Sequence, residues 1–214
     1  MNGGVRTRFA DRRDAGRRLA EPVAALELTR PLVVALPRGG VPVAAEVAAA
    51  LGAPLDVLVV RKLGVPTQPE LALGAVAEGG AEVVDHLLAR DRRVTPDQLD
   101  HLRADALDEI ARRVRTYRDG RPPPSGTGHD VVLVDDGLAT GRTAEAAIAA
   151  LRGLGAERVV LAVPVASPAT AADLALVADE VVTVLRPRNM RAVGLWYDDF
   201  TQTTDAEVVA ALSR

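Results

Sequence analysis

The residues most able to do chemistry lie in one segment, residues 131–143, which reads VVLVDDGLATGRT. Four apolar residues are followed by two adjacent carboxylates, Asp135 and Asp136, and then by a loop rich in Gly and Thr. The amides of such a loop, and the positive end of a following helix, can bind a phosphate. The two carboxylates can accept hydrogen bonds from the vicinal hydroxyls of a sugar. The spacing therefore predicts a ribose 5-phosphate pocket.

Within the loop, Thr140 and Thr143 can add hydroxyl donors, and the glycines at 137 and 141 permit close approach of the backbone. Other phosphate motifs do not fit this segment. Arg142 stands where a Walker A loop needs Lys, and the chain contains no GxGxxG dinucleotide fingerprint. The simpler alternative is an ordinary strand-to-helix turn in which the aspartates only cap the helix.

The elements that must position this loop follow from apolar runs bounded by turn residues. Five runs predict strands, at residues 32–36, 55–60, 131–134, 159–165 and 181–185. They are continuously apolar, as in strands that are covered on both faces. Alanine-rich stretches at 42–51, 143–154 and 168–177 predict helices between them. This alternation predicts a doubly wound α/β fold with a mainly parallel five-stranded sheet, whose strand ends bind the ligand.

An insertion of about residues 63–128 interrupts the rhythm. Residues 71–84 predict a hairpin that turns at Glu78-Gly79-Gly80. Thr95 and Pro96 predict the start of an amphipathic helix, and the Pro- and Gly-rich residues 120–128 a surface connection. We expect one domain over residues 1–214, with a C-terminal extension at about 187–214.

Composition excludes several classes. The 214 residues include no Cys, so disulfide frameworks, Cys-ligated zinc and thiol catalysis are excluded. A net charge of −3 argues against nonspecific nucleic-acid binding. The longest apolar run is far shorter than the ~20 residues of a membrane helix, and no apolar stretch follows the N-terminal arginines. We expect a cytoplasmic protein without a membrane partner.

The segment 131–143 resembles the phosphoribosyl pyrophosphate (PRPP) motif of type I phosphoribosyltransferases. In that family the acidic pair binds the ribose hydroxyls and the loop binds the 5-phosphate. The resemblance implies the first role, and a catalytic one, for Asp135 and Asp136. It implies the second role for the residues of the loop, Ala139, Thr140, Gly141, Arg142 and Thr143.

The resemblance covers roughly residues 30–200 and includes two further loops. Arg38-Gly39-Gly40, after the first strand, is similar to the family's pyrophosphate loop. Arg61 and Lys62 stand at the predicted end of the second strand, where the family often supplies cations to the leaving pyrophosphate, so Lys62 is a further catalytic candidate. Mg²⁺ is implied as a cofactor that arrives with PRPP and needs no direct protein ligand. The chain reads like a little-characterised bacterial subgroup.

The residues that would contact the acceptor base form a less specific pattern than the PRPP motif. Ala139 replaces the Asp that hypoxanthine-guanine transferases usually place there, and the loop is similar in part to adenine transferases and in part to a pyrimidine-operon attenuator. Trp196, Tyr197 and Phe200 could form a stacking wall for a heterocycle, or could instead close the edge of the sheet.

The leading hypothesis is thus a Mg²⁺- and PRPP-dependent transferase that joins the phosphoribosyl group to a nucleobase-like nitrogen heterocycle, releases pyrophosphate and serves nucleotide salvage. One alternative is a regulatory protein of the same fold that binds PRPP or a nucleotide, and RNA. Another is a hydrolase of phosphorylated ribose compounds. A homodimer is implied by family analogy.

Overall fold

The main sheet of the computed structural model has five parallel strands, and this confirms the predicted fold class. The structure describes residues 8–119 and 121–213, without the side chain of Glu70. The strand order is β2-β1-β6-β7-β8. The bounds are Leu55–Val57 (β2), Leu32–Ala35 (β1), Asp130–Val134 (β6), Arg158–Val165 (β7) and Glu180–Leu185 (β8).

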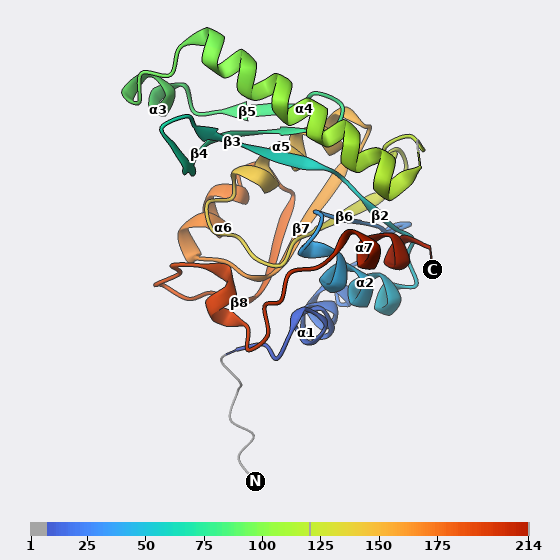
Figure 1. Cartoon of the computed structure of the whole chain (residues 1–214). Coiled ribbons are helices and arrows are strands. Elements are labelled where there is room, and N and C mark those ends of the chain that lie inside the picture. Colours follow the sequence, from blue (N-terminus) through green and yellow to red (C-terminus); the bar gives the residue numbers. More distant parts are fainter. Residues whose placement is uncertain (1–7, 120, 214) are drawn as a thin grey trace.

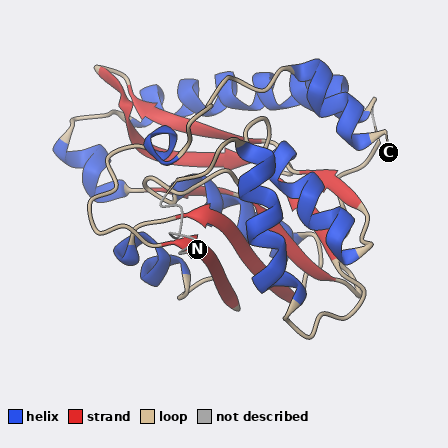
Figure 2. Cartoon of the chain, turned by 90° about the horizontal axis from the view of Figure 1, so that it is seen from below, coloured by secondary structure: helices blue, strands red, loops and turns tan. Residues whose placement is uncertain are grey.

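Helices cover both faces of this sheet (Figures 1 and 2). Alternate residues of each strand point to opposite faces. Val33 and Ala35 of β1 belong to the apolar cluster that contains α1 (Arg12–Ala24) and α2 (Gly40–Leu51). Val34 belongs to the cluster that contains α5 (Arg142–Gly153) and α6 (Pro168–Leu174). Burial on both sides explains why the strands read as continuous apolar runs.

The insertion forms a separate layer, here called the hood, over residues 60–118 (Figure 1). Its antiparallel sheet has the order β3-β4-β5. The strands are Val60–Val65 (β3), Gln68–Ala77 (β4) and Glu82–Val84 (β5), followed by α3 (His86–Asp91) and α4 (Pro96–Arg118). The predicted hairpin and long helix are present, and Thr95 caps α4 in a capping box with Gln98.

One sequence-based boundary is wrong. The run 55–60 is not a single strand, because β2 ends at Val57 and β3 begins at Val60 in the hood. Leu58 and Val59, at the junction, are fully buried, so the apolar run continues where the strand does not. Arg61 and Lys62 therefore belong to the hood rather than to the edge of the main sheet.

The C-terminal segment forms backbone hydrogen bonds with the segment that precedes α1. It contains the short 3₁₀ helix η1 (Val193–Trp196) and α7 (Asp205–Leu212). The amide of Phe9 donates to the carbonyl of Trp196, and the amide of Asp198 donates to the carbonyl of Phe9. None of the described helices combines the length and the apolar composition that a bilayer crossing requires.

Candidate active site

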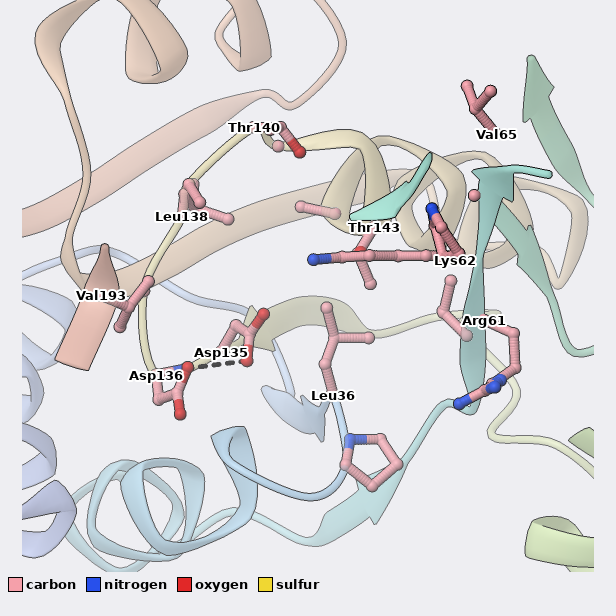
Figure 3. A pocket seen from close by; sticks show the side chains of 18 of the residues that line it. Leu36, Arg61, Lys62, Val65, Asp135, Asp136, Leu138, Thr140, Thr143 and Val193 are labelled. Carbon is pink, nitrogen blue, oxygen red and sulfur yellow. Dashed lines mark hydrogen bonds between the residues drawn. The ribbon is translucent and has the colours of Figure 1, made fainter. Parts of the chain in front are cut away.

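The acidic pair lies just beyond β6, at the carboxyl edge of the main sheet (Figure 3). Each side chain has one oxygen fixed by the protein. Asp135 Oδ1 accepts from the amide of Asp136 at 2.8 Å, and Asp136 Oδ2 accepts from Nε of Arg12 at 2.8 Å. No described residue donates to the second oxygen of either carboxylate, so both are available to a ligand.

Burial raises the pKa of Asp135 well above its usual range, and the neighbouring charge of Asp136 raises it further. Burial also raises the pKa of Asp136, but the guanidinium of Arg12 opposes that shift. Lys62 lowers the pKa of both carboxyls. The pair is thus a concentration of negative charge that partly depends on cations from other elements.

A cavity of about 950 Å³, here called the large cavity, opens beside the pair and beneath the hood. Its polar part is formed by the acidic pair, Arg61, Lys62 and the loop residues Ala139, Thr140, Gly141 and Thr143. Its apolar part includes Leu36, Val60, Val65, Leu102, Val193 and Phe200. The structure therefore brings together most residues of the predicted 5-phosphate and ribose sites.

The loop that leads into α5 has the form of an anion cradle. Gly141 occupies the N-cap position with φ 77°, a conformation that favours glycine. The amides of residues 139–143 donate no hydrogen bond to any described residue. The hydroxyl of Thr143 is buried and has no hydrogen-bond partner among the described residues. Free amides, an unpaired hydroxyl and a helix N-terminus at one place suit a phosphate.

Two cations line the large cavity from β3 of the hood. Lys62 extends across the large cavity toward Thr143 and the acidic pair, whereas Arg61 points toward Leu36 and its loop (Figure 3). Neither forms an ion pair with a described residue, and the buried Nε of Arg61 has no hydrogen-bond partner there. Unpaired cations that line a cavity are well suited to an anionic ligand.

The loop Arg38-Gly39-Gly40 borders a second, small cavity of about 500 Å³ on the other side of Asp136. Arg38 and Gly39 line it, and Arg38 pairs with Asp205 at 3.7 Å. A Cβ atom on Gly40 would lie 2.7 Å from the carbonyl oxygen of Val134. Gly40 thus lets α2 begin directly against the end of β6.

Besides Arg38, Gly39 and Gly40, three more predicted site residues lie away from the large cavity. Arg142 points to the hood, where it pairs with Asp85 at 2.9 Å. Tyr197 is buried, packs against Phe9 at a centroid distance of 5.3 Å, and donates its hydroxyl to the carbonyl of Asp136 at 2.5 Å. Trp196 also lines neither cavity. Of the aromatic candidates, Phe200 alone reaches both cavities.

Sequence reasoning missed Arg12. Its side chain contacts Asp136, donates to the carbonyl of Thr201 at 2.7 Å and lies over the ring of Phe200 at 3.9 Å. The helix α1 that carries it has a detectable pattern, because Asp11 can cap it and apolar residues follow at helical spacing. Nothing local to Arg12 indicates its partner, which lies 124 residues away in the sequence.

Comparison with known proteins agrees with this geometry. A family model described as the phosphoribosyl transferase domain matches residues 10–189. The chain belongs to the phosphoribosyltransferase family. The chain is similar to TT1426 from Thermus thermophilus, whose crystal structure is known. The two sequences are 48% identical, and the structures have a TM-score of 0.81 over 96% of this chain and 97% of TT1426. The fold is that of type I phosphoribosyltransferases.

Two further proteins are similar to this member of the phosphoribosyltransferase family. Rv0571c of Mycobacterium tuberculosis, whose name as a phosphoribosyl transferase is provisional, is 50% identical over 206 residues, or 96% of this chain and 46% of that protein. The chain thus spans about half the length of the curated relatives it matches. AQ2163 of Aquifex aeolicus shares the fold, with 13% identity and a TM-score of 0.52 over 94% of this chain and 86% of that one.

Proposed function

We propose that the protein transfers the 5-phosphoribosyl group of PRPP to a nucleobase-like nitrogen heterocycle and releases pyrophosphate, with Mg²⁺. The observation that carries the proposal is the juxtaposition in one cavity of the acidic pair, the loop residues 139–141 and 143, and two cations, Arg61 and Lys62, that form no ion pair with a described residue. Family membership supports the reaction class.

In this proposal the ribose lies between the acidic pair and the loop. The free oxygens of Asp135 and Asp136 accept hydrogen bonds from the two ribose hydroxyls, and the loop amides with Thr143 bind the 5-phosphate. Displacement at the anomeric carbon passes through an oxocarbenium-like state, as at other glycosidic centres. The carboxylates stabilise the positive charge that develops on the ring.

The leaving pyrophosphate is assigned to the side of Arg61, Lys62 and the loop Arg38-Gly39-Gly40. Within the described residues no group of three or more His, Asp or Glu side chains could hold a metal ion. Arg61 and Lys62 suit the diphosphate itself, so Mg²⁺ would enter as the counterion of that group and would need no protein ligand of its own. When bound there, Mg²⁺ neutralises the leaving group.

The acceptor is assigned to the apolar part of the large cavity, which Val65, Val193 and Phe200 line. Phe200 is 38% exposed, so its ring can still gain contact area from a planar ring. The base itself, the cytoplasmic setting, a role in salvage and the homodimer remain predictions.

Calorimetry with PRPP and Mg²⁺ tests the binding step. We expect micromolar affinity for the wild type and no measurable binding for the double variant Asp135→Asn/Asp136→Asn. A matched control is Asp105→Asn/Asp108→Asn, which removes the same charge from the exposed face of α4. Equal affinity of the wild type and the acidic-pair variant would refute the proposal.

Screening PRPP consumption across purines, pyrimidines and pyridine or imidazole carboxylates, with mass detection of the ribotide, tests the transfer step. Formation of a ribotide with one class of acceptor supports the proposal. Release of pyrophosphate without any acceptor would indicate the hydrolase, and PRPP binding without turnover would indicate the regulatory protein.

A further inference from the structure

We propose that Arg12 is a positioning residue for the acidic pair. Its side chain fixes the carboxylate of Asp136 and links that carboxylate to Phe200 in the acceptor region. This inference deepens the proposed function and rests on it for its consequence in catalysis. The geometric part, from Arg12 to Asp136, concerns the ligand-free protein alone.

The contact between Arg12 and Asp136 is shielded from solvent. The two side chains are only 11% and 14% exposed, and Nε lies 2.8 Å from Oδ2. A surface ion pair contributes little, but a shielded and hydrogen-bonded one strongly favours the ionised carboxylate. Asp136 forms no other ion pair with a described residue.

The contact also selects which oxygen of Asp136 meets the ligand. Arg12 occupies Oδ2, and the backbone of Gly39 lies close to the same atom. Oδ1 is left for a ribose hydroxyl. Without Arg12 the carboxylate could rotate and exchange its oxygens, so the free one would no longer have a fixed direction.

The rest of the Arg12 side chain reaches the acceptor wall. One terminal nitrogen donates to the carbonyl of Thr201 at 2.7 Å, and the guanidinium lies 3.9 Å from the centre of the Phe200 ring. A guanidinium can stack on an aromatic face while its edge donates hydrogen bonds, which lysine cannot reproduce. Arg12 thus holds Phe200 and Asp136 in a fixed relation.

Other titratable or charged groups lie near Asp136 and affect its titration. Asp135 adjoins it on the same strand end, Lys62 approaches from β3, and the Tyr197 hydroxyl donates to its carbonyl. Arg38 of the loop before α2 and Arg113 of α4 line the small cavity beside it. None of these groups donates a hydrogen bond to the Asp136 carboxylate, whereas Arg12 does.

The test uses three variants of the full chain. Arg12→Gln removes the charge, Arg12→Lys keeps it without the planar fork, and Arg13→Gln removes one charge from the same helix at a surface pair with Glu46. Carboxyl-carbon NMR of the ligand-free proteins, with the Asp136 signal assigned from Asp136→Asn, follows the titration of Asp136. Thermal melts verify that each variant is folded.

We expect Asp136 to titrate at higher pH in Arg12→Gln than in the wild type, while Arg12→Lys returns it toward the wild-type value and Arg13→Gln leaves it unchanged. In calorimetry, the dissociation constant for PRPP rises about tenfold or more in Arg12→Gln. The Michaelis constant for the acceptor identified by the screen rises in Arg12→Lys, because the stacking on Phe200 is lost.

Identical Asp136 titration in the wild type, Arg12→Gln and Arg13→Gln would overturn the positioning role, whether or not PRPP binds. Should Asp136 respond to Arg12 while the wild type binds no PRPP, the proposed function fails but the contact between Arg12 and Asp136 stands. If Arg12→Gln does not fold, the folded Arg12→Lys variant decides: an acceptor Michaelis constant equal to that of the wild type refutes the link to Phe200.

Discussion

Replacing Gly39 with alanine places a methyl group against the carboxylate of Asp136. A Cβ atom at this position would lie 2.1 Å from Asp136 Oδ2 and 2.8 Å from its Cγ. The backbone of Gly39 has φ −60° and ψ −35°, which alanine adopts without strain. The substitution therefore acts on the position of the carboxylate and not on the conformation of the loop.

The size of the effect follows from the displacement. Non-bonded heavy atoms rest at about 3.5 Å, so the carboxylate has to move by about 1 Å or more. Such a shift breaks its hydrogen bond with Arg12, now 2.8 Å long. A hydrogen bond to a charged group contributes about 1.5 to 3 kcal/mol, so we expect PRPP affinity to fall about 10- to 100-fold.

Calorimetry with PRPP and Mg²⁺ measures the loss, and urea denaturation measures the free energy of unfolding. We expect the stability to change by no more than about 2 kcal/mol, because Gly39 lies at a helix start next to a cavity. Gly153→Ala in α5 is the matched control, since a Cβ atom there meets no atom within 4 Å. Unchanged PRPP affinity in Gly39→Ala would refute the placement of the Asp136 carboxylate in the binding site.

Three further predictions concern stability. The folded-state pKa of Asp135 lies above its unfolded value, so the charged carboxylate lowers the stability of the folded protein at neutral pH. The melting temperature of Asp135→Asn should therefore be higher than that of the wild type at pH 7. The difference should vanish below about pH 4, where the carboxyl is protonated in both states. A melting difference that is the same at both pH values contradicts this. Arg118→Met leaves Glu78 buried without its partner and should lower the free energy of unfolding in urea by about 3 kcal/mol or more, whereas a loss below about 1 kcal/mol would mean that the pair is not needed. Thr95→Ala removes the cap of α4 and should cost about 1 kcal/mol in the same assay, with faster amide exchange in the first turn of α4; unchanged exchange there would show that the cap contributes nothing.

The main sheet and the phosphate loop could be predicted because their signals are local. Each inner strand is buried on both faces and therefore reads as an unbroken apolar run. The segment 131–143 places the acidic pair, the loop and the helix start next to each other in sequence. A strand end and the following helix are adjacent in space by covalent connection, so these contacts need no knowledge of the rest of the chain.

The remainder of the site depends on contacts between distant segments. The break between β2 and β3 is hidden by the burial of Leu58 and Val59, which places Arg61 and Lys62 on a different sheet from the one predicted. Three neighbouring aromatic residues near the C-terminus suggest one wall, but pairing with Phe9 turns Tyr197 inward. The hydrophobic pattern alone could not separate these outcomes.

The pairing of Phe9 with Tyr197 has a practical consequence for protein engineering. The hydroxyl of Tyr197 holds the Asp136 carbonyl, so the geometry of the acidic pair is sensitive to what happens at residues remote from the motif itself. Removing Phe9, or fusing another domain so close to it that its pairing with Tyr197 is lost, would change the position of the acidic pair. An insertion between Gly79 and Gly80 leaves this pairing untouched, because nothing lies within 4 Å of a Cβ atom added there, but both glycines must be kept because their φ is positive.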